Sequence, residues 1–215
     1  MRSSQSSMTS YVMLRSVNAS VFVGISVDGF IARANDTFDF LDAGGGGSAP
    51  HGFEEFMASV DALVMGRRTY EVVRPFATWP YGDTPVFVLS SKPLKPAPPG
   101  AVVHRMSGTP ARIVSALAAR GFRHLYVDGG MTVQRFLDAG LIRRLILNRV
   151  PVLIGTGISL FGPVRKDILL RHVATREYAG GLVQTEYTVV PARPRKARQR
   201  KVKAGSTRVA RRAGT

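Results

Sequence analysis

The chain has 215 residues, 45% of them apolar and 20% charged, with a formal net charge of +16, so it can bury one sizeable core and is not a wholly disordered polypeptide. It has no cysteine, which excludes disulfides, thiolate catalysis and every zinc site built on cysteine; we assign no metal ligand. No run of about 18 apolar residues predicts a membrane-spanning helix, and residues 1–16 read as a flexible leader without the apolar segment of a secretory signal, so we expect a cytoplasmic protein.

The positive charge is concentrated at the end of the chain. Residues 191–215 hold ten lysines or arginines and no acidic residue, which leaves 20 basic against 14 acidic residues, a charge of +6, in 1–190. Because Val202 and Val209 are its only large apolar residues, we expect this tail to be disordered. Two interpretations stay open: loose binding to nucleic acid or another polyanion, or a solvated tail with no partner, which the lack of aromatic residues favours.

The first half of the body alternates extended and helical patterns. Runs rich in β-branched and aromatic residues predict strands over 20–25, 62–65, 85–90 and 101–104. An apolar stripe at helical spacing within 53–60 predicts an amphipathic helix, and a second helix opens at Thr69 and ends at Pro75. Residues 33–50, which include a run of four glycines, are expected to form a loop.

The second half continues the alternation and ends in two extended runs. Thr109 and Pro110 are typical of the N-cap and first position of a helix, which Gly121 ends. A strand over 124–127, a helix over 131–139 and a strand over 145–150 follow, and then extended runs over 168–178 and 182–190 joined by a glycine-rich hairpin turn. This order predicts an α/β fold with a mostly parallel sheet and an antiparallel hairpin at one edge.

Three segments at strand ends favour anion binding. Residues 128–132 (DGGMT) lie between a strand and a helix, where glycines allow close approach to the backbone and free N–H groups suit a pyrophosphate. Residues 65–71 (MGRRTYE) place two arginines and a threonine at a helix start, and residues 89–92 (LSSK) place two hydroxyls and a cation after a strand. Each segment alone is equally typical of an ordinary turn, but together they suggest a dinucleotide with an extra phosphate.

The order of SVFVGISVDGFIA, ALVMGRRTYE, VFVLSS and LYVDGG resembles the dihydrofolate-reductase superfamily. The stretch LYVDGGMTVQRFLDAGLIRRLILNRVPVLIGTGISLFG more specifically resembles the reductase domain of riboflavin-biosynthesis deaminase–reductases and their stand-alone relatives. The resemblance covers about residues 18–190. It implies a three-layer reductase domain over 17–190 with helices on both faces of the sheet, NADPH as cofactor and a homodimer.

The resemblance also implies a set of cofactor-binding residues. Those expected at the phosphates are Gly66, Arg67, Arg68, Thr69, Asp128, Gly129, Gly130, Met131 and Thr132. Those expected at the adenosine 2′-phosphate are Ser90 and Ser91, with Lys92 beside them. Those expected at the nicotinamide pocket are Gly24, Ile31 and Ala32, although plain core packing explains Gly24 and Ile31 nearly as well.

The chain departs from the family pattern where a substrate would bind. It lacks the deaminase zinc site, and Arg143 and Arg144 replace an acidic pair that the family usually carries. The candidate proton donors are Asp28, Glu54 and His51, each with a structural alternative: a turn for the first, and a solvated position for the other two. Glu55 is a candidate on the same ground as its neighbour Glu54, its position in the chain. Trp79 and Tyr81 are expected either to line a substrate pocket or to pack on the surface.

Two kinds of function follow. The first is an NADPH-dependent reductase that acts on a pterin-like compound, a riboflavin-pathway pyrimidine or another small heterocycle or carbonyl compound. The second is a non-catalytic nucleotide-binding or structural dimer module, with a basic tail that binds nucleic acid. Fold alone does not decide between them.

Overall fold

The computed structural model describes residues 17–44 and 51–191, and the expected leader and basic tail lie outside these ranges. The strands are β1 (Asn18–Ile25), β2 (Phe30–Ala32), β3 (Ala62–Gly66), β4 (Val86–Leu89), β5 (Val103–Met106), β6 (His124–Asp128), β7 (Ile142–Arg149), β8 (Ile158–Ser159), β9 (Leu170–Glu177) and β10 (Val183–Val189). The helices are η1 (Asp39–Gly44), α2 (Phe53–Ala58), α3 (Arg67–Val73), α4 (Pro110–Ala119), α5 (Gly130–Asp138) and η2 (Ala179–Gly181). Within the described ranges, no helix has the length and hydropathy needed to span a bilayer.

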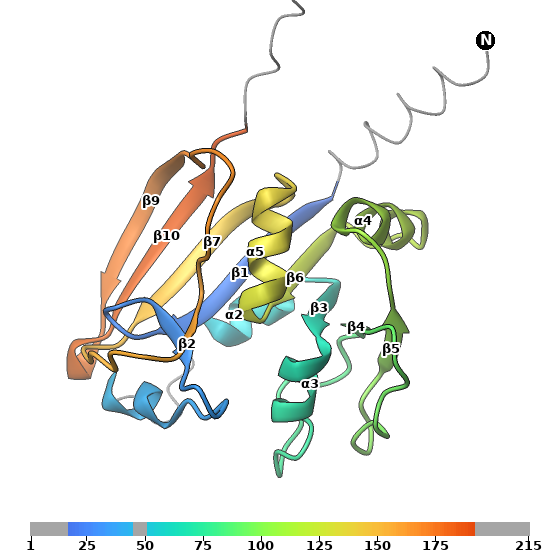
Figure 1. Cartoon of the computed structure of the whole chain (residues 1–215), viewed down its shortest axis with the longest axis horizontal. Helices are drawn as coiled ribbons and strands as arrows, with labels where there is room; N and C mark the ends of the chain where they lie inside the picture. Colours follow the sequence, from blue (N-terminus) through green and yellow to red (C-terminus); the bar gives the residue numbers. More distant parts are fainter. Residues whose placement is uncertain (1–16, 45–50, 192–215) are drawn as a thin grey trace, which may run out of the picture.

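Eight strands form one sheet in the order β5-β4-β3-β6-β1-β7-β10-β9 (Figure 1). The first six are parallel, and β10 and β9 add antiparallel pairs at one edge. This confirms the predicted sheet and its C-terminal hairpin. Chain order and strand order differ, so β3 and β6, which are far apart in sequence, lie side by side.

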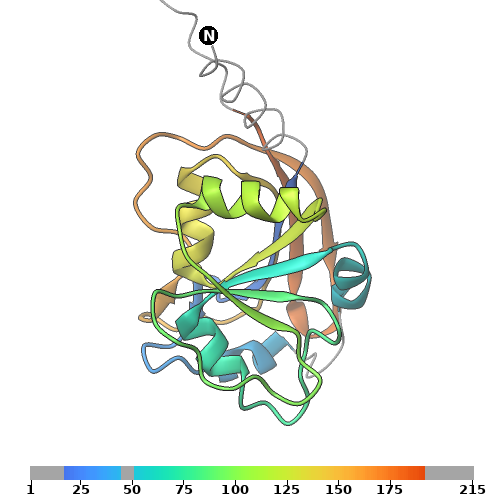
Figure 2. The ribbon, with the colours of Figure 1, turned by 90° about the vertical axis from the view of Figure 1, so that its right-hand side faces the viewer.

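Helices cover both faces of the sheet, as predicted. Alternate residues of β3 point to opposite faces: Ala62 and Val64 pack in the core with α4 and α5, while Leu63 and Met65 pack in the core with α2 and α3. Figures 1 and 2 show α5 and α2 on opposite sides of the sheet. All four side chains of β3, from Ala62 to Met65, are buried, which is typical of a parallel strand covered on both faces.

Most predicted elements are present, with shifted ends. The Thr109 hydroxyl accepts a hydrogen bond from the Arg112 backbone N–H (3.4 Å), which confirms the N-cap of α4. Helix α2 ends at Ala58 rather than continuing to residue 60, and β7 begins three residues earlier than expected. The helix η1, within the predicted loop, and the two-residue β8 are absent from the prediction because such short elements carry no periodic signal.

Candidate functional site

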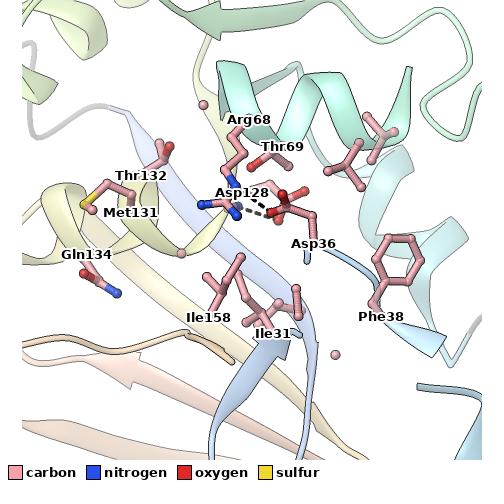
Figure 3. Close-up of a pocket in the computed structure, with 18 of the residues that line it drawn as sticks. Ile31, Asp36, Phe38, Arg68, Thr69, Asp128, Met131, Thr132, Gln134 and Ile158 are labelled. Atoms are coloured by element: carbon pink, nitrogen blue, oxygen red, sulfur yellow. Dashed lines mark hydrogen bonds and ion pairs between the residues drawn. The ribbon is translucent and has the colours of Figure 1, made fainter. Parts of the chain in front are cut away.

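A cavity of about 1140 Å³ lies at the carboxyl ends of the parallel strands (Figure 3). Its wall is formed by the ends of β1, β3 and β6, by the first residues of α3 and α5, and by β2 and β8. Open α/β sheets bind ligands at this edge, and a typical pocket for one small ligand measures about 300–1,000 Å³. The volume of this cavity therefore exceeds the usual range for one small ligand.

The predicted anion-binding segments at the ends of β3 and β6 pack directly against each other in the wall of this cavity. A Cβ added at Gly129 would collide with Oγ1 of Thr69, and one added at Gly66 would lie 3.1 Å from Oγ1 of Thr132. Gly129 also has a φ of 85°, which disfavours any other residue. Each junction thus presents a glycine to the threonine side chain of the other, and the contact at Gly129 leaves no room for a larger residue.

Most residues that we expected at the cofactor line the cavity. They are Gly24, Ile31, Ala32, Gly66, Arg67, Arg68, Thr69, Asp128, Gly129, Gly130, Met131 and Thr132. Ser90 and Ser91 do not line it, although their neighbour Leu89 does. The Ser90 hydroxyl is buried and donates to the Lys92 carbonyl oxygen (2.7 Å), whereas Ser91 is exposed. Ser90 therefore shapes this turn.

Both arginines of α3 that line the cavity are already paired with carboxylates. Arg67 donates to Glu71 on the next turn (2.7 Å), and Arg68 pairs with Asp36 from the segment after β2 (2.6 Å). Figure 3 shows Arg68 and Asp36 meeting over the cavity, with Met131 and Thr132 on one side and Phe38 on the other. Asp36 has a left-handed backbone, with a φ of 70°. An anion that binds either arginine must compete with its carboxylate partner.

Asp128 has an environment that differs from the one its place in the glycine-rich motif suggested. Its side chain shares a sheet face with Tyr126, the face that α2 and α3 cover. Burial raises the pKa of its carboxyl from 3.8 to about 6, although the Gly129 N–H (2.7 Å to Oδ1) and the Tyr81 hydroxyl act in the opposite direction. The cavity thus contains a carboxyl that exchanges protons near neutral pH.

The three predicted proton donors lie away from the cavity lining. The Asp28 carboxylate accepts hydrogen bonds from the backbone N–H groups of Gly155 (2.8 Å) and Ile154 (3.3 Å), and its pKa is lowered, chiefly by a hydrogen bond from the Ser26 side chain. This is the structural role in a turn that we had weighed as the alternative for Asp28.

His51 and Glu54 flank the start of α2. The His51 ring lies against Tyr178 at 4.6 Å between ring centroids, and its carbonyl oxygen accepts from the Gln184 side chain (2.6 Å). Glu54 and its neighbour Glu55 are exposed, while Phe53 is the residue of this helix that lines the cavity. The structure brings none of the three predicted donors to the cavity wall.

Other cavity residues lack a signal in the sequence. Phe38 and Leu41 come from the segment around η1, and Ser159 and Phe161 come from β8 and the loop after it.

Arg105 on β5 is exposed and donates to the Ser91 carbonyl oxygen (3.3 Å), which adds a cation to the corner predicted for a 2′-phosphate. The parallel pairing of β4 with β5 brings Arg105 to Ser91, so short-range patterns in the sequence do not indicate this contact.

Of the two aromatic residues predicted to wall a pocket, Tyr81 lines the cavity and Trp79 does not. The Trp79 ring instead packs edge-on against Tyr81, with 5.0 Å between centroids, and against Tyr70 at 6.4 Å. Trp79 therefore supports the wall from behind.

A second, smaller cavity of about 450 Å³ lies at the amino ends of the parallel strands, opposite the first cavity. Arg143, Arg144 and Arg171 line it, together with His124 and His172. Arg144 forms a two-bond ion pair with Glu186 (2.7 and 3.0 Å), while Arg143 donates to the Gly140 carbonyl oxygen (3.1 Å). The arginine pair that replaces the family's acidic residues therefore contributes to a basic hollow.

Comparisons with known proteins agree with this architecture. The RibD C-terminal domain family matches residues 18–184. A protein of Shewanella sp. PV-4 assigned to riboflavin biosynthesis is 35% identical, with a TM-score of 0.74 over 81% of this chain and 99% of that one.

Two more distant structures show the fold alone. A deaminase/5-amino-6-(5-phosphoribosylamino)uracil reductase of Thermotoga maritima is 15% identical, with a TM-score of 0.65 over 85% of this chain and 59% of that one. Dihydrofolate reductase of Enterococcus faecalis is 16% identical, with a TM-score of 0.52 over 80% of this chain and 94% of that one. The chain therefore has the dihydrofolate-reductase fold and belongs to the RibD C-terminal domain family, whose members are reductase-like proteins.

Proposed function

We propose that this chain is an NADPH-dependent reductase that delivers hydride to a small heterocyclic or carbonyl compound, of the pterin or riboflavin-pathway pyrimidine type. The observation that carries the proposal is the pair of glycine–threonine junctions that pack against each other in the wall of a cavity larger than the usual pocket for one small ligand. Membership of a reductase-like family supports it.

The residues present fit a phosphorylated dinucleotide. Gly129 and Gly130 open the nine-residue helix α5, whose first N–H groups suit a pyrophosphate. Arg67 and Arg68 are placed to exchange their carboxylate partners for phosphate oxygens. Lys92 and Arg105, with the exposed Ser91, form the corner proposed for the 2′-phosphate. When bound, NADPH supplies the hydride.

Asp128 is the group that we assign to proton delivery. It lies at the end of β6, beside Tyr81 and Tyr126, and it lines the cavity. A carboxyl with a pKa of about 6 holds a proton in a useful fraction of molecules near neutral pH and has the strength to transfer it to a nitrogen or oxygen of the substrate. We therefore propose Asp128, and not Asp28, Glu54 or His51, as the proton donor.

Nicotinamide fluorescence tests the proposal. We expect saturable binding of NADPH that is tighter than binding of NADH, because only the former carries the 2′-phosphate. Arg67→Ala weakens both nucleotides, Arg105→Ala reduces the preference between them, and Arg143→Ala, the same charge change at the opposite edge, alters neither. Absence of binding of both nucleotides contradicts the proposal and favours a non-catalytic module.

The opposite edge supports a second role as a polyanion contact. The hollow lined by Arg143 and Arg171 also includes Thr188, and the segment 191–215 with its ten basic residues follows three positions later in the sequence. Binding through such charges weakens steeply with salt. We expect the full chain to bind duplex DNA in a salt-dependent way, and a chain ending at residue 191 to lose most of that binding. Equal binding by both chains contradicts this role.

A homodimer through the C-terminal hairpin is also part of the proposal. Strand β9 ends the sheet, so one of its sides offers unpaired backbone groups, and Leu170 and Val173 on it are 42% and 48% exposed. Light scattering should give twice the mass of one chain, and Val173→Lys should lower it.

A further inference from the structure

The second cavity, at the amino ends of the parallel strands, is built in a way that a loose contact with a polyanion does not require. Its volume of about 450 Å³ is in the range of a pocket for one small ligand. Among the described residues, it shares none of its lining with the first cavity, although β1 reaches both: Ser20 lines the second and Gly24 lines the first. The two cavities are therefore separate candidate sites.

Two interruptions of the strand pairing bring extra residues to this cavity. The pairing of β7 with β1 skips Arg143, because Ile142 and Arg144 pair with consecutive residues of β1. The pairing of β9 with β10 skips Val173 in the same way, and Val173 also lines the cavity. Successive side chains of a regular strand point to opposite faces, yet Arg143 and Arg144 both line the cavity. Such interruptions re-aim side chains and are over-represented next to active sites.

The lining of the second cavity carries more positive than negative charge. Arg144 forms the two-bond pair with Glu186, which is the one acidic residue among the described lining residues. Arg143 donates to the Gly140 carbonyl oxygen, and Arg171 is exposed; within residues 17–44 and 51–191, neither forms an ion pair with a carboxylate. With the histidines counted as neutral, three arginines against one glutamate leave two positive charges for a ligand to neutralise.

Polar groups from β1, β6 and β10 complete the cavity. The Nδ1–H of His124 donates to the Ser59 carbonyl oxygen (2.7 Å), since a carbonyl can only accept, and Nε2 of the neutral ring then accepts from the Ser20 hydroxyl (2.7 Å). Ser20 is 1% exposed, so this pair is a fixed polar base. Asn18 and Thr188 add an amide and a hydroxyl to the lining, which are further donors for an anion.

From these observations we propose that the second cavity binds a small molecule through a dianionic phosphate monoester group. Such a group carries close to two negative charges near neutral pH and has three strong acceptor oxygens, which suit the forked donors of Arg143 and Arg171. A phosphodiester of duplex DNA has one negative charge, so a single one leaves one of the two arginines without a counter-charge. The site is separate from the proposed reductase cavity and uses no residue of the segment 191–215.

Calorimetric titration of the full chain with phenyl phosphate tests the proposal, with phenyl sulfate and succinate as matched ligands. We expect one phenyl phosphate per chain at this site and binding of phenyl sulfate, which has a similar shape but one negative charge, that is about tenfold weaker. Arg171→Gln should weaken phenyl phosphate by about tenfold, and its exposed position leaves the fold intact. Arg112→Gln, the same charge change at an exposed position of α4, should alter nothing. The segment 191–215 is present in every variant, so its own binding cancels from these comparisons.

Backbone amide resonances locate the bound anion. We expect phenyl phosphate to shift the resonances of 18–20 and 171–173 and to leave those of 128–132 unchanged. The proposal is overturned if no saturable binding occurs, if phenyl sulfate or succinate binds as tightly as phenyl phosphate, or if both arginine variants lose binding equally. Shifts confined to 128–132 also overturn it, because they place the anion in the first cavity. The NADPH titration decides the proposed reductase separately, since the two sites have different linings.

Discussion

Replacing Asp128 by asparagine should stabilise the protein at alkaline pH. Burial raises the pKa of this carboxyl from 3.8 to about 6, so ionising it costs more in the folded than in the unfolded chain. At about 1.36 kcal/mol per pKa unit, the cost reaches about 3 kcal/mol above pH 7. It falls to about 1 kcal/mol at pH 4.5, where the folded-state carboxyl is protonated, and vanishes below the unfolded pKa. Asparagine keeps an oxygen for the Gly129 N–H.

Urea unfolding of the wild type and of Asp128→Asn at pH 8 and pH 4.5 measures this effect. The free energy of unfolding of the variant should exceed that of the wild type by about 2 kcal/mol more at pH 8 than at pH 4.5. Asp28→Asn is the matched control with the opposite sign. The Ser26 side chain lowers the pKa of the Asp28 carboxyl, so Asp28→Asn should lose stability relative to the wild type at pH 8 and recover it as the pH falls.

Activity provides the second readout of the same variant. Once a substrate is identified, Asp128→Asn should lower kcat much more than it weakens NADPH binding. The decline of the wild-type rate above pH 6 should be absent from the variant. A stability difference between Asp128→Asn and the wild type that does not change with pH would refute the assignment of a raised pKa. A wild-type rate profile in the variant would refute the role of Asp128 as proton donor.

Three further substitutions test the packing and one charge pair. Gly129→Ala should cost more than 2 kcal/mol of stability, since its Cβ collides with Thr69 in addition to the backbone strain at a φ of 85°, and it should weaken NADPH binding. Gly140→Ala, at a φ of 66° with open space around it, should cost only about 1 kcal/mol in thermal unfolding and leave binding intact. The two-bond pair with Arg144 lowers the pKa of Glu186, and Glu186→Gln removes that pair. The variant should therefore lose about 1 kcal/mol of unfolding free energy at pH 7 and progressively less as the pH falls below 4.5. A loss that stays the same at pH 7 and below pH 4.5 would contradict the pairing.

Short-range patterns in the sequence predict most of the elements and the location of the cavity end that we propose for the cofactor. The alternation of strands and helices, the Thr109–Pro110 helix start and the glycines of residues 128–132 depend on residues within a few positions of one another, and the structure has each of them. The order of strands is different: β3 lies beside β6 only through a long crossover, so nothing local indicates that Thr69 meets Gly129.

The substrate side of the site was decided by tertiary structure. Asp28 and His51 have the residue types of proton donors, but their side chains are used in a turn and in a contact with Tyr178. Asp128 looked like part of a phosphate-binding turn, and its raised pKa comes from burial in the fold, which outweighs the opposing hydrogen bonds from the Gly129 N–H and the Tyr81 hydroxyl.

What the sequence alone determined is most of the elements, the family resemblance and the glycine positions, because propensity, capping and backbone freedom act over a few residues. What only the tertiary structure decided is which charges are paired and which acid is desolvated. Those properties depend on the neighbours that strand order brings together: Arg68 with Asp36, and Asp128 with Tyr81.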